Sequence, residues 1–142
     1  MDSKEFTRNR CILAKTQNQL AKILCVSPKA IQSFEQGWRN IPSHIERELL
    51  LLISLKTCFN SNIQPCWEIK DCPDRWREKC IVWELQVMHF CWFVNGTFCQ
   101  GKEHQKWAEK IEFCKECEVF SSMLPSITSP NLPKDTVNDI QK

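Results

Sequence analysis

The chain has 142 residues, a formal net charge of +2 and ten cysteines. This length suffices for one domain or two small ones, and the longest apolar run, residues 49–53, is far too short to span a bilayer. Basic residues outnumber acidic ones in residues 1–64, whereas residues 65–120 carry a small acidic excess. The composition therefore excludes a membrane-spanning helix and predicts two modules with different partners.

Residues 3–14 have a weak helical pattern, and a stronger one begins at Thr16. Thr16 is a good N-cap, and Gln19 completes a capping box with it. The apolar residues that follow recur at helical spacing up to Leu24, which predicts a first short helix and then a turn at Cys25 and Val26.

A second short helix is predicted to follow that turn. Ser27 is an N-cap, Pro28 occupies the first helical position, where its missing N–H is harmless, and Gly37 ends the helix. Ser43 caps a third segment, with Glu46 completing another capping box. Two short helices joined by a tight turn and followed by a third predict a helix-turn-helix bundle over residues 1–57.

The stretch TQNQLAKILCVSPKAIQSFEQGWRNIP resembles the Cro/repressor-like (XRE-type) helix-turn-helix family. The similarity covers roughly residues 10–55 and implies that the partner is double-stranded DNA, bound by a homodimer. One departure is Cys25, because the family usually has glycine at the turn, and a residue with a side chain is strained there if φ is positive. The residues that carry the resemblance are Thr16, Gln17, Leu20, Ala21, Leu24, Val26, Ser27, Ile31, Phe34, Glu35, Gly37 and Arg39.

In this arrangement the helix after Ser27 lies in the major groove, with its N-terminal residues toward the base edges. Lysine can donate to guanine, and glutamine can bond adenine with both ends of its amide. The resemblance implies a phosphate contact for Gln17, and Arg39 is expected to make another, whereas Trp38 is expected to pack in the core. The predicted DNA-contacting residues are Gln17, Ser27, Lys29, Gln32, Ser33, Gln36 and Arg39.

Residues 57–65 read as a linker, residues 66–120 as a small irregular cysteine-rich module, and residues 121–142 as a flexible tail. The module has the spacing C-x5-C-x7-C-x10-C-x7-C-x14-C-x2-C, and tryptophan follows Cys66 and Cys91. It resembles the two-CW cysteine-rich domain, which implies a cytoplasmic module attached to regulators and sensors. The N-terminus has no secretory signal, so we expect a cytoplasmic protein with reduced thiols.

Three uses of these thiols remain open on the sequence. They can hold an iron–sulfur cluster, hold a structural Zn²⁺, or stay free and buried or form reversible disulfides. Cys114 and Cys117 are the most favoured ligands and Cys80 the least, and His89 or His104 could complete a zinc site. The predicted metal ligands are Cys66, Cys72, Cys80, Cys91, Cys99, Cys114 and Cys117, whereas packing is expected for Cys11, Cys25 and Cys58.

No motif indicates an enzyme, because the sequence has no glycine-rich phosphate loop, no recognisable nucleophile pair and no HExxH. From the predicted helices and the cysteine spacing we expect a mainly α fold, with a helix-turn-helix bundle and a cysteine-rich metal-binding module. The predicted function is a DNA-binding transcriptional regulator whose metal or iron–sulfur module senses redox state or stabilises the fold. The alternative is a zinc-stabilised protein-interaction scaffold without regulatory DNA binding.

Overall fold

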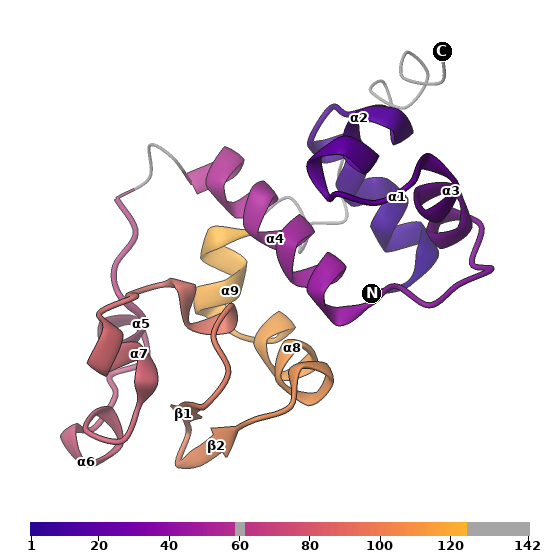
Figure 1. Cartoon of the computed structure of the whole chain (residues 1–142). Helices are drawn as coiled ribbons and strands as arrows, with labels where there is room; N and C mark the ends of the chain where they lie inside the picture. The colour runs from indigo at the N-terminus through magenta and orange to yellow at the C-terminus, as the bar shows by residue number, and fades with distance from the viewer. Residues whose placement is uncertain (59–61, 125–142) are drawn as a thin grey trace. The chain divides into compact units, whose positions relative to one another are not determined.

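The computed structural model describes residues 1–58 and 62–124, drawn as ribbons in Figure 1. These residues are mainly helical with a single two-stranded sheet, which confirms the predicted mainly α fold class. The chain divides into two compact units, one of residues 1–57 and one that begins at Cys58. In the described ranges no helix is long and apolar enough to cross a membrane. Most of the predicted flexible tail, residues 125–142, lies outside the described residues.

The first unit contains four helices: α1 (Ser3–Ile12), α2 (Gln17–Ile23), α3 (Pro28–Glu35) and α4 (Ser43–Cys58). The predicted start of α2 is confirmed, since Thr16 and Gln19 form a complete capping box. The start of α3 is confirmed too, because the Ser27 side chain accepts from the backbone N–H of Ala30. Capping therefore fixes both ends of the connection between α2 and α3.

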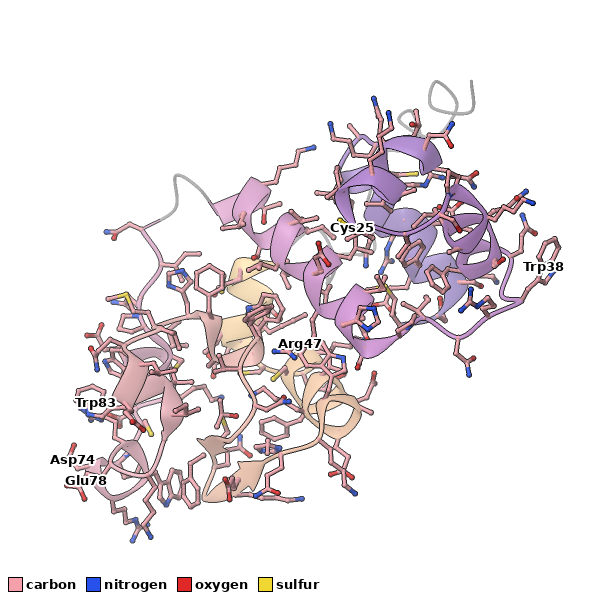
Figure 2. The ribbon with its side chains drawn as sticks, viewed as in Figure 1. Cys25, Trp38, Arg47, Asp74, Glu78 and Trp83 are labelled. Atoms are coloured by element: carbon pink, nitrogen blue, oxygen red, sulfur yellow. The ribbon has the colours of Figure 1, made fainter. Side chains whose placement is uncertain are left out.

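The core of the first unit is built around Phe6, whose ring meets that of Phe34 edge-on at a centroid distance of 5.6 Å. Trp38 does not join this core, and the expectation that it packs there is wrong. Its side chain is 73 % exposed, and Figure 2 shows it projecting away from the helices. Gly37 has a φ of +73°, so the chain turns directly after α3. Trp38 follows this turn, and its indole lies at the surface.

The second unit is made of short elements (Figure 1). Its strands pair antiparallel, with Thr97 opposite His104, and the turn between them has positive φ at Gln100 and Gly101. Most of its helices have no side-chain cap. The elements are α5 (Cys66–Ile69), α6 (Asp74–Arg77), α7 (Ile81–Leu85), the 3₁₀ helix η1 (Phe90–Trp92), β1 (Thr97–Cys99), β2 (Lys102–His104), α8 (Trp107–Lys115) and α9 (Glu118–Met123).

Aromatic packing forms much of the core of the second unit. Trp92 is fully buried, and its ring stands perpendicular to that of Phe120 at a centroid distance of 5.8 Å. The module was expected to end at Phe120, but α9 continues to Met123, and both Met123 and Leu124 are fully buried. The unit extends past the predicted boundary because α9 presents apolar side chains one helical turn apart.

Candidate metal centre and nucleic-acid interface

The second unit contains a pocket of about 270 Å³. Protein interiors rarely hold spaces larger than a water molecule. A pocket of this volume could therefore hold a ligand. Cysteines reach it from six different segments, which the sequence separates by up to 51 residues. They are Cys66 at the start of α5, Cys72 between α5 and α6, Cys80 before α7, Cys91 in η1, Cys99 at the end of β1 and Cys117 before α9.

Apart from Gln100, the other side chains on the pocket wall are aromatic, apolar or cationic. Lys70 and Arg77 both line it, and none of the described lining residues is an aspartate or a glutamate. Thiolates suit soft metals and iron–sulfur clusters, whereas carboxylates suit Mg²⁺ and Ca²⁺. Both cations are paired with carboxylates, Lys70 with Glu118 and Arg77 with Asp74, so it is the thiols of the wall that suit it to a thiolate-ligated centre. Its aromatic members are Trp67, Trp76, Trp83, Phe98 and Phe113.

Hydrogen bonds hold the cysteine-bearing loops in place. The backbone N–H of Phe98, on β1, donates to the sulfur of Cys80 over 3.4 Å. Arg77 donates from Nη2 to the carbonyl oxygen of Cys72 over 2.9 Å, and its guanidinium lies 4.9 Å from the Trp83 ring centroid. Hydrogen bonds to sulfur tune thiolate-ligated centres, so Cys80, the ligand least favoured from the sequence, has a local environment that suits ligation.

Burial favours the neutral form of several of these thiols. It raises the pKa of Cys99 to about 11 and also raises the pKa of Cys72. A hydrogen bond with the Cys66 thiol, together with burial, raises the pKa of Cys91 well above its ordinary value. Metal ligation needs the thiolate form, so loading this pocket has to release protons.

Cys114 does not reach the pocket wall, although the sequence paired it with Cys117 as the most favoured ligands. It lies in α8 and is 7 % exposed, and burial raises its pKa to about 12. The two cysteines lie on either side of the connection between α8, which ends at Lys115, and α9, for which Cys117 is the N-cap, and the Cys117 thiol is close enough to act on the pKa of Cys114.

Neither candidate histidine lines the pocket. The His104 ring is stacked on Phe113 with centroids 4.6 Å apart, and the His89 ring lies 4.8 Å from that of Phe90. Within residues 1–58 and 62–124, no three His, Cys, Asp or Glu side chains already converge as a ready-made single-ion site. Six of the seven predicted cysteines thus line the pocket, and the seventh, Cys114, lies in α8.

Two of the pocket cysteines lie next to strained backbone. Asp71, which precedes Cys72, has a φ of +46°, and Gln100, which follows Cys99, has a φ of +51°. Left-handed backbone is unfavourable for residues with a side chain and tends to cluster at ligand-binding sites. These positive φ values fall at turns directly beside the two cysteines, and that of Gln100 belongs to the turn between β1 and β2.

The cysteines outside the module were expected to serve packing. Cys25 does not, because it is exposed and has a φ of +52°, so the departure from glycine falls at a left-handed turn position (Figure 2). Cys11 is half-buried in α1. The side chain of Cys58 lies outside the described part of the chain.

The predicted DNA-contacting residues of α3 divide into two groups. Lys29, Gln32 and Gln36 are exposed and available to an outside partner. Ser27 caps α3, and the Ser33 hydroxyl donates to the carbonyl oxygen of Lys29 over 2.8 Å. The two serines are therefore engaged within the helix itself.

Arg39, just after α3, is exposed, and its guanidinium lies 5.8 Å from the Phe34 ring centroid. The contact leaves the cation at the surface next to the exposed Trp38. Together these two side chains extend the outward-facing surface of α3 beyond the end of the helix.

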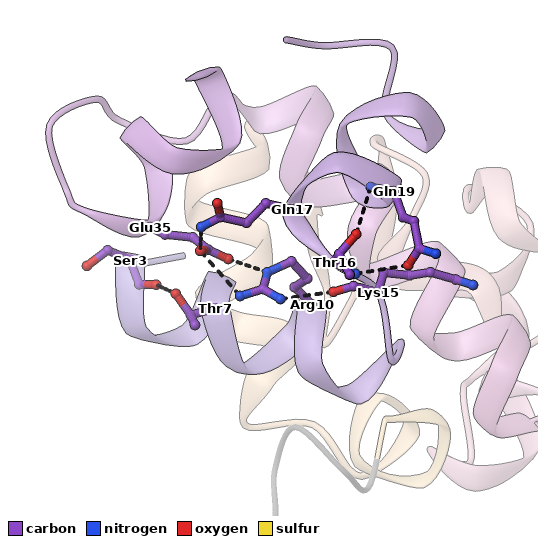
Figure 3. A network of polar contacts seen from close by, with 8 residues as sticks. All are labelled: Ser3, Thr7, Arg10, Lys15, Thr16, Gln17, Gln19 and Glu35. Carbon is purple, nitrogen blue, oxygen red and sulfur yellow. Dashed lines mark hydrogen bonds and ion pairs between the residues drawn. The ribbon is translucent and has the colours of Figure 1, made fainter. Parts of the chain in front are cut away.

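Gln17 takes part in a network inside the first unit, shown in Figure 3. Its amide donates to a Glu35 carboxylate oxygen, which also accepts from Arg10. Arg10 in turn donates to the carbonyl oxygen of Lys15 over 2.9 Å. The amide group expected to meet a phosphate thus joins α2 to α3. Arg10 and Glu35 are 25 residues apart, and no local pattern in the sequence indicates that they pair.

Comparison with known proteins adds no relative: no family model, curated protein or solved structure matches the chain.

Proposed function

We propose that this protein is a DNA-binding regulator whose second unit holds an iron–sulfur cluster through cysteine thiolates. The observation that carries the proposal is the pocket of about 270 Å³ with cysteines from six segments on its wall. The ligands are drawn from Cys66, Cys72, Cys80, Cys91, Cys99 and Cys117. A cluster held there supplies one-electron redox chemistry.

The pocket of about 270 Å³ has room for a cluster as well as for a single zinc ion. A structural zinc draws four ligand atoms to about 2.3 Å from one centre. A cluster brings several iron and sulfide atoms and needs room between its cysteines. The aromatic residues Trp67, Trp83 and Phe98 on the wall would limit the access of water, which influences the potential of such a centre.

The proposal assigns DNA binding to the first unit. The helices α2 and α3 are short and joined by the four residues 24–27, which supports the proposal of a helix-turn-helix whose second helix would enter the major groove. Lys29 and Gln32 lie on the exposed side of α3 and have the chemistry to read base edges. Gln36 and Arg39 extend this surface toward the phosphates.

Anaerobic purification of the full chain with iron, sulfide and zinc analysis tests the cluster. We expect brown protein containing iron and sulfide, and we expect that combining Cys66→Ser with Cys99→Ser abolishes the colour. Cys25→Ser is the matched control, because Cys25 lies in the turn of the first unit. Colourless wild-type protein with stoichiometric zinc would contradict the iron–sulfur assignment and support a zinc-stabilised scaffold.

Selection from a random DNA library by the full chain tests the regulator. We expect one enriched motif whose binding weakens with salt, because phosphate contacts release counterions. Comparing cluster-loaded and cluster-stripped protein at matched salt then tests control by the cluster. Failure to enrich any motif would contradict DNA reading, and equal affinities of the two forms would contradict control.

A further inference from the structure

Lys110 is a lysine at a core position. It is 1 % exposed, and its helix α8 also buries Trp107, Ile111 and Cys114. These four residues follow the i, i+3, i+4, i+7 pattern of the buried face of a helix. An apolar residue is the usual occupant of such a position, since lysine is almost never fully buried unless it is paired.

The hydrogen-bond partner of Lys110 among the described residues is neutral. Its Nζ donates to Oγ1 of Thr97, itself fully buried, over 2.5 Å. Among the ion pairs of the described residues, none includes Lys110. A buried ammonium group whose hydrogen-bond partner is one hydroxyl is strongly unfavourable, so a charged Lys110 requires a negative charge close by.

The groups near Lys110 that can supply that charge are thiols. Cys114 is one helical turn further along α8. Thr97 and Cys99 are two residues apart on β1 and therefore share one face of the strand. The Lys110 ammonium acts on the pKa values of Cys91, Cys99 and Cys114, lowering each against the larger effect of burial. Two of these three thiols, Cys91 and Cys99, line the pocket.

We propose that Lys110 is the buried counter-charge of the thiolate-ligated centre, held in position by Thr97. This inference rests on the proposed function, because the centre supplies the negative charge. Four thiolates around an iron–sulfur core carry a net negative charge, and a cation near the ligands favours both ligation and the more negative, reduced state of the cluster. Lys110 is thus a positioning residue that acts through the cluster.

Substituting Lys110→Met tests the inference on the full chain, loaded anaerobically with Fe²⁺ and sulfide. We expect loading to weaken about 10- to 100-fold, as for other residues that support metal ligands, and the reduction midpoint to become more negative. The metal-free variant should be at least as stable as wild type, because an uncompensated charge has been removed. Lys110→Arg should retain most of the wild-type midpoint. Lys106→Met is the matched control, since Lys106 is a lysine of the same segment with a side chain 79 % exposed.

A midpoint and loading of Lys110→Met equal to those of Lys106→Met would overturn the inference while leaving the cluster assignment intact. Wild-type protein that takes up neither iron with sulfide nor Zn²⁺ would overturn both, because Lys110 would then have nothing to compensate. If zinc alone binds, the same comparison of variants is made on zinc affinity. If Lys110→Met fails to fold, Lys110→Gln, which keeps a donor for Thr97, is measured in its place.

Discussion

Glu35 ties together three helices of the first unit through a single carboxylate. It accepts from Arg10 of α1 and Gln17 of α2 while belonging to α3 itself. The side chains of Arg10 and Glu35 are only 10 % and 7 % exposed, so neither charge has much access to water. Breaking such a pair leaves the other charge stranded.

We expect Glu35→Ala to destabilise the protein by roughly 3–5 kcal/mol, because Arg10 remains buried without its partner. Urea denaturation followed by circular dichroism measures the effect. The double variant Arg10→Met with Glu35→Leu is the control, since it removes both charges and should recover most of the loss. A single variant no less stable than the double one would contradict this interpretation.

Cys25 occupies a backbone conformation that favours glycine. Its φ is +52°, in the left-handed region that only glycine adopts without strain. We expect Cys25→Gly to stabilise the protein by up to about 1 kcal/mol. Cys25→Ser keeps the strain and should leave stability nearly unchanged, so the difference between the two variants in urea denaturation isolates the backbone effect. Equal midpoints would show that the turn stores no strain.

Some side chains of the helix α3 are exposed, and others form hydrogen bonds within the helix. Lys29 and Gln32 are exposed, whereas the Ser33 hydroxyl is bonded to the Lys29 carbonyl oxygen. The helix therefore contains neighbouring residues with different expected effects on DNA binding. This difference is sharper than the sequence alone allowed, because both kinds of residue were predicted to contact DNA.

We expect Gln32→Ala to reduce discrimination at one base pair of the selected motif by about 1–3 kcal/mol. Ser33→Ala should leave affinity and specificity almost unchanged. Arg39→Ala should weaken binding to all sequences alike and lower the salt slope by about one. Fluorescence anisotropy with the selected duplex and its single-base variants separates these three results, and a Ser33→Ala effect as large as that of Gln32→Ala would be inconsistent with the proposed face.

The elements of the two units differ in how far the sequence predicted them. Thr16, Ser27 and Gly37 carry local capping and turn signals, so the bounds of α2 and α3 were predictable. The helices α5 and α6 start without side-chain caps and span only one turn each, which leaves no periodicity to detect. The hairpin of β1 and β2 was missed for the same reason. In α8, however, the position of Lys110 within a buried stripe is visible in the sequence.

The sequence predicted which residue types form the candidate pocket, but not which of the cysteines line it. The cysteine count and the aromatic neighbours indicated a thiol-based site, and six of the seven candidates line one pocket. Cys114 is buried in α8 and does not line the pocket, whereas Cys80 lines it next to a strand that approaches from 18 residues away. Both are tertiary facts without a local sequence signal.

At the scale of the whole chain, the two units can be observed separately by their tryptophans. Five of the six tryptophans belong to residues 62–124, and Trp38 belongs to the first unit. A guest that binds only the folded second unit stabilises that unit by about 2.7 kcal/mol at a free concentration one hundred times its dissociation constant. The first unit has no share in this stabilisation unless the two units unfold together.

If the proposed cluster is bound, we expect its removal to lower the urea midpoint seen by tryptophan fluorescence in the Trp38→Phe variant. The first unit should unfold at an unchanged midpoint, visible as a separate transition in far-ultraviolet circular dichroism. The two probes therefore diverge in stripped protein. Coincident transitions that shift together would show instead that the units form one cooperative block.

The exposed sulfur at the turn between α2 and α3 also affects how the protein must be handled. In air, Cys25 offers two molecules a route to covalent joining that needs no folded interface. A band of doubled mass on a non-reducing gel would then arise from storage, not from the homodimer predicted to bind DNA. Self-association is therefore best measured by sedimentation of Cys25→Ser protein, in which any remaining dimer is held by non-covalent contacts or by other cysteines that reductant will release.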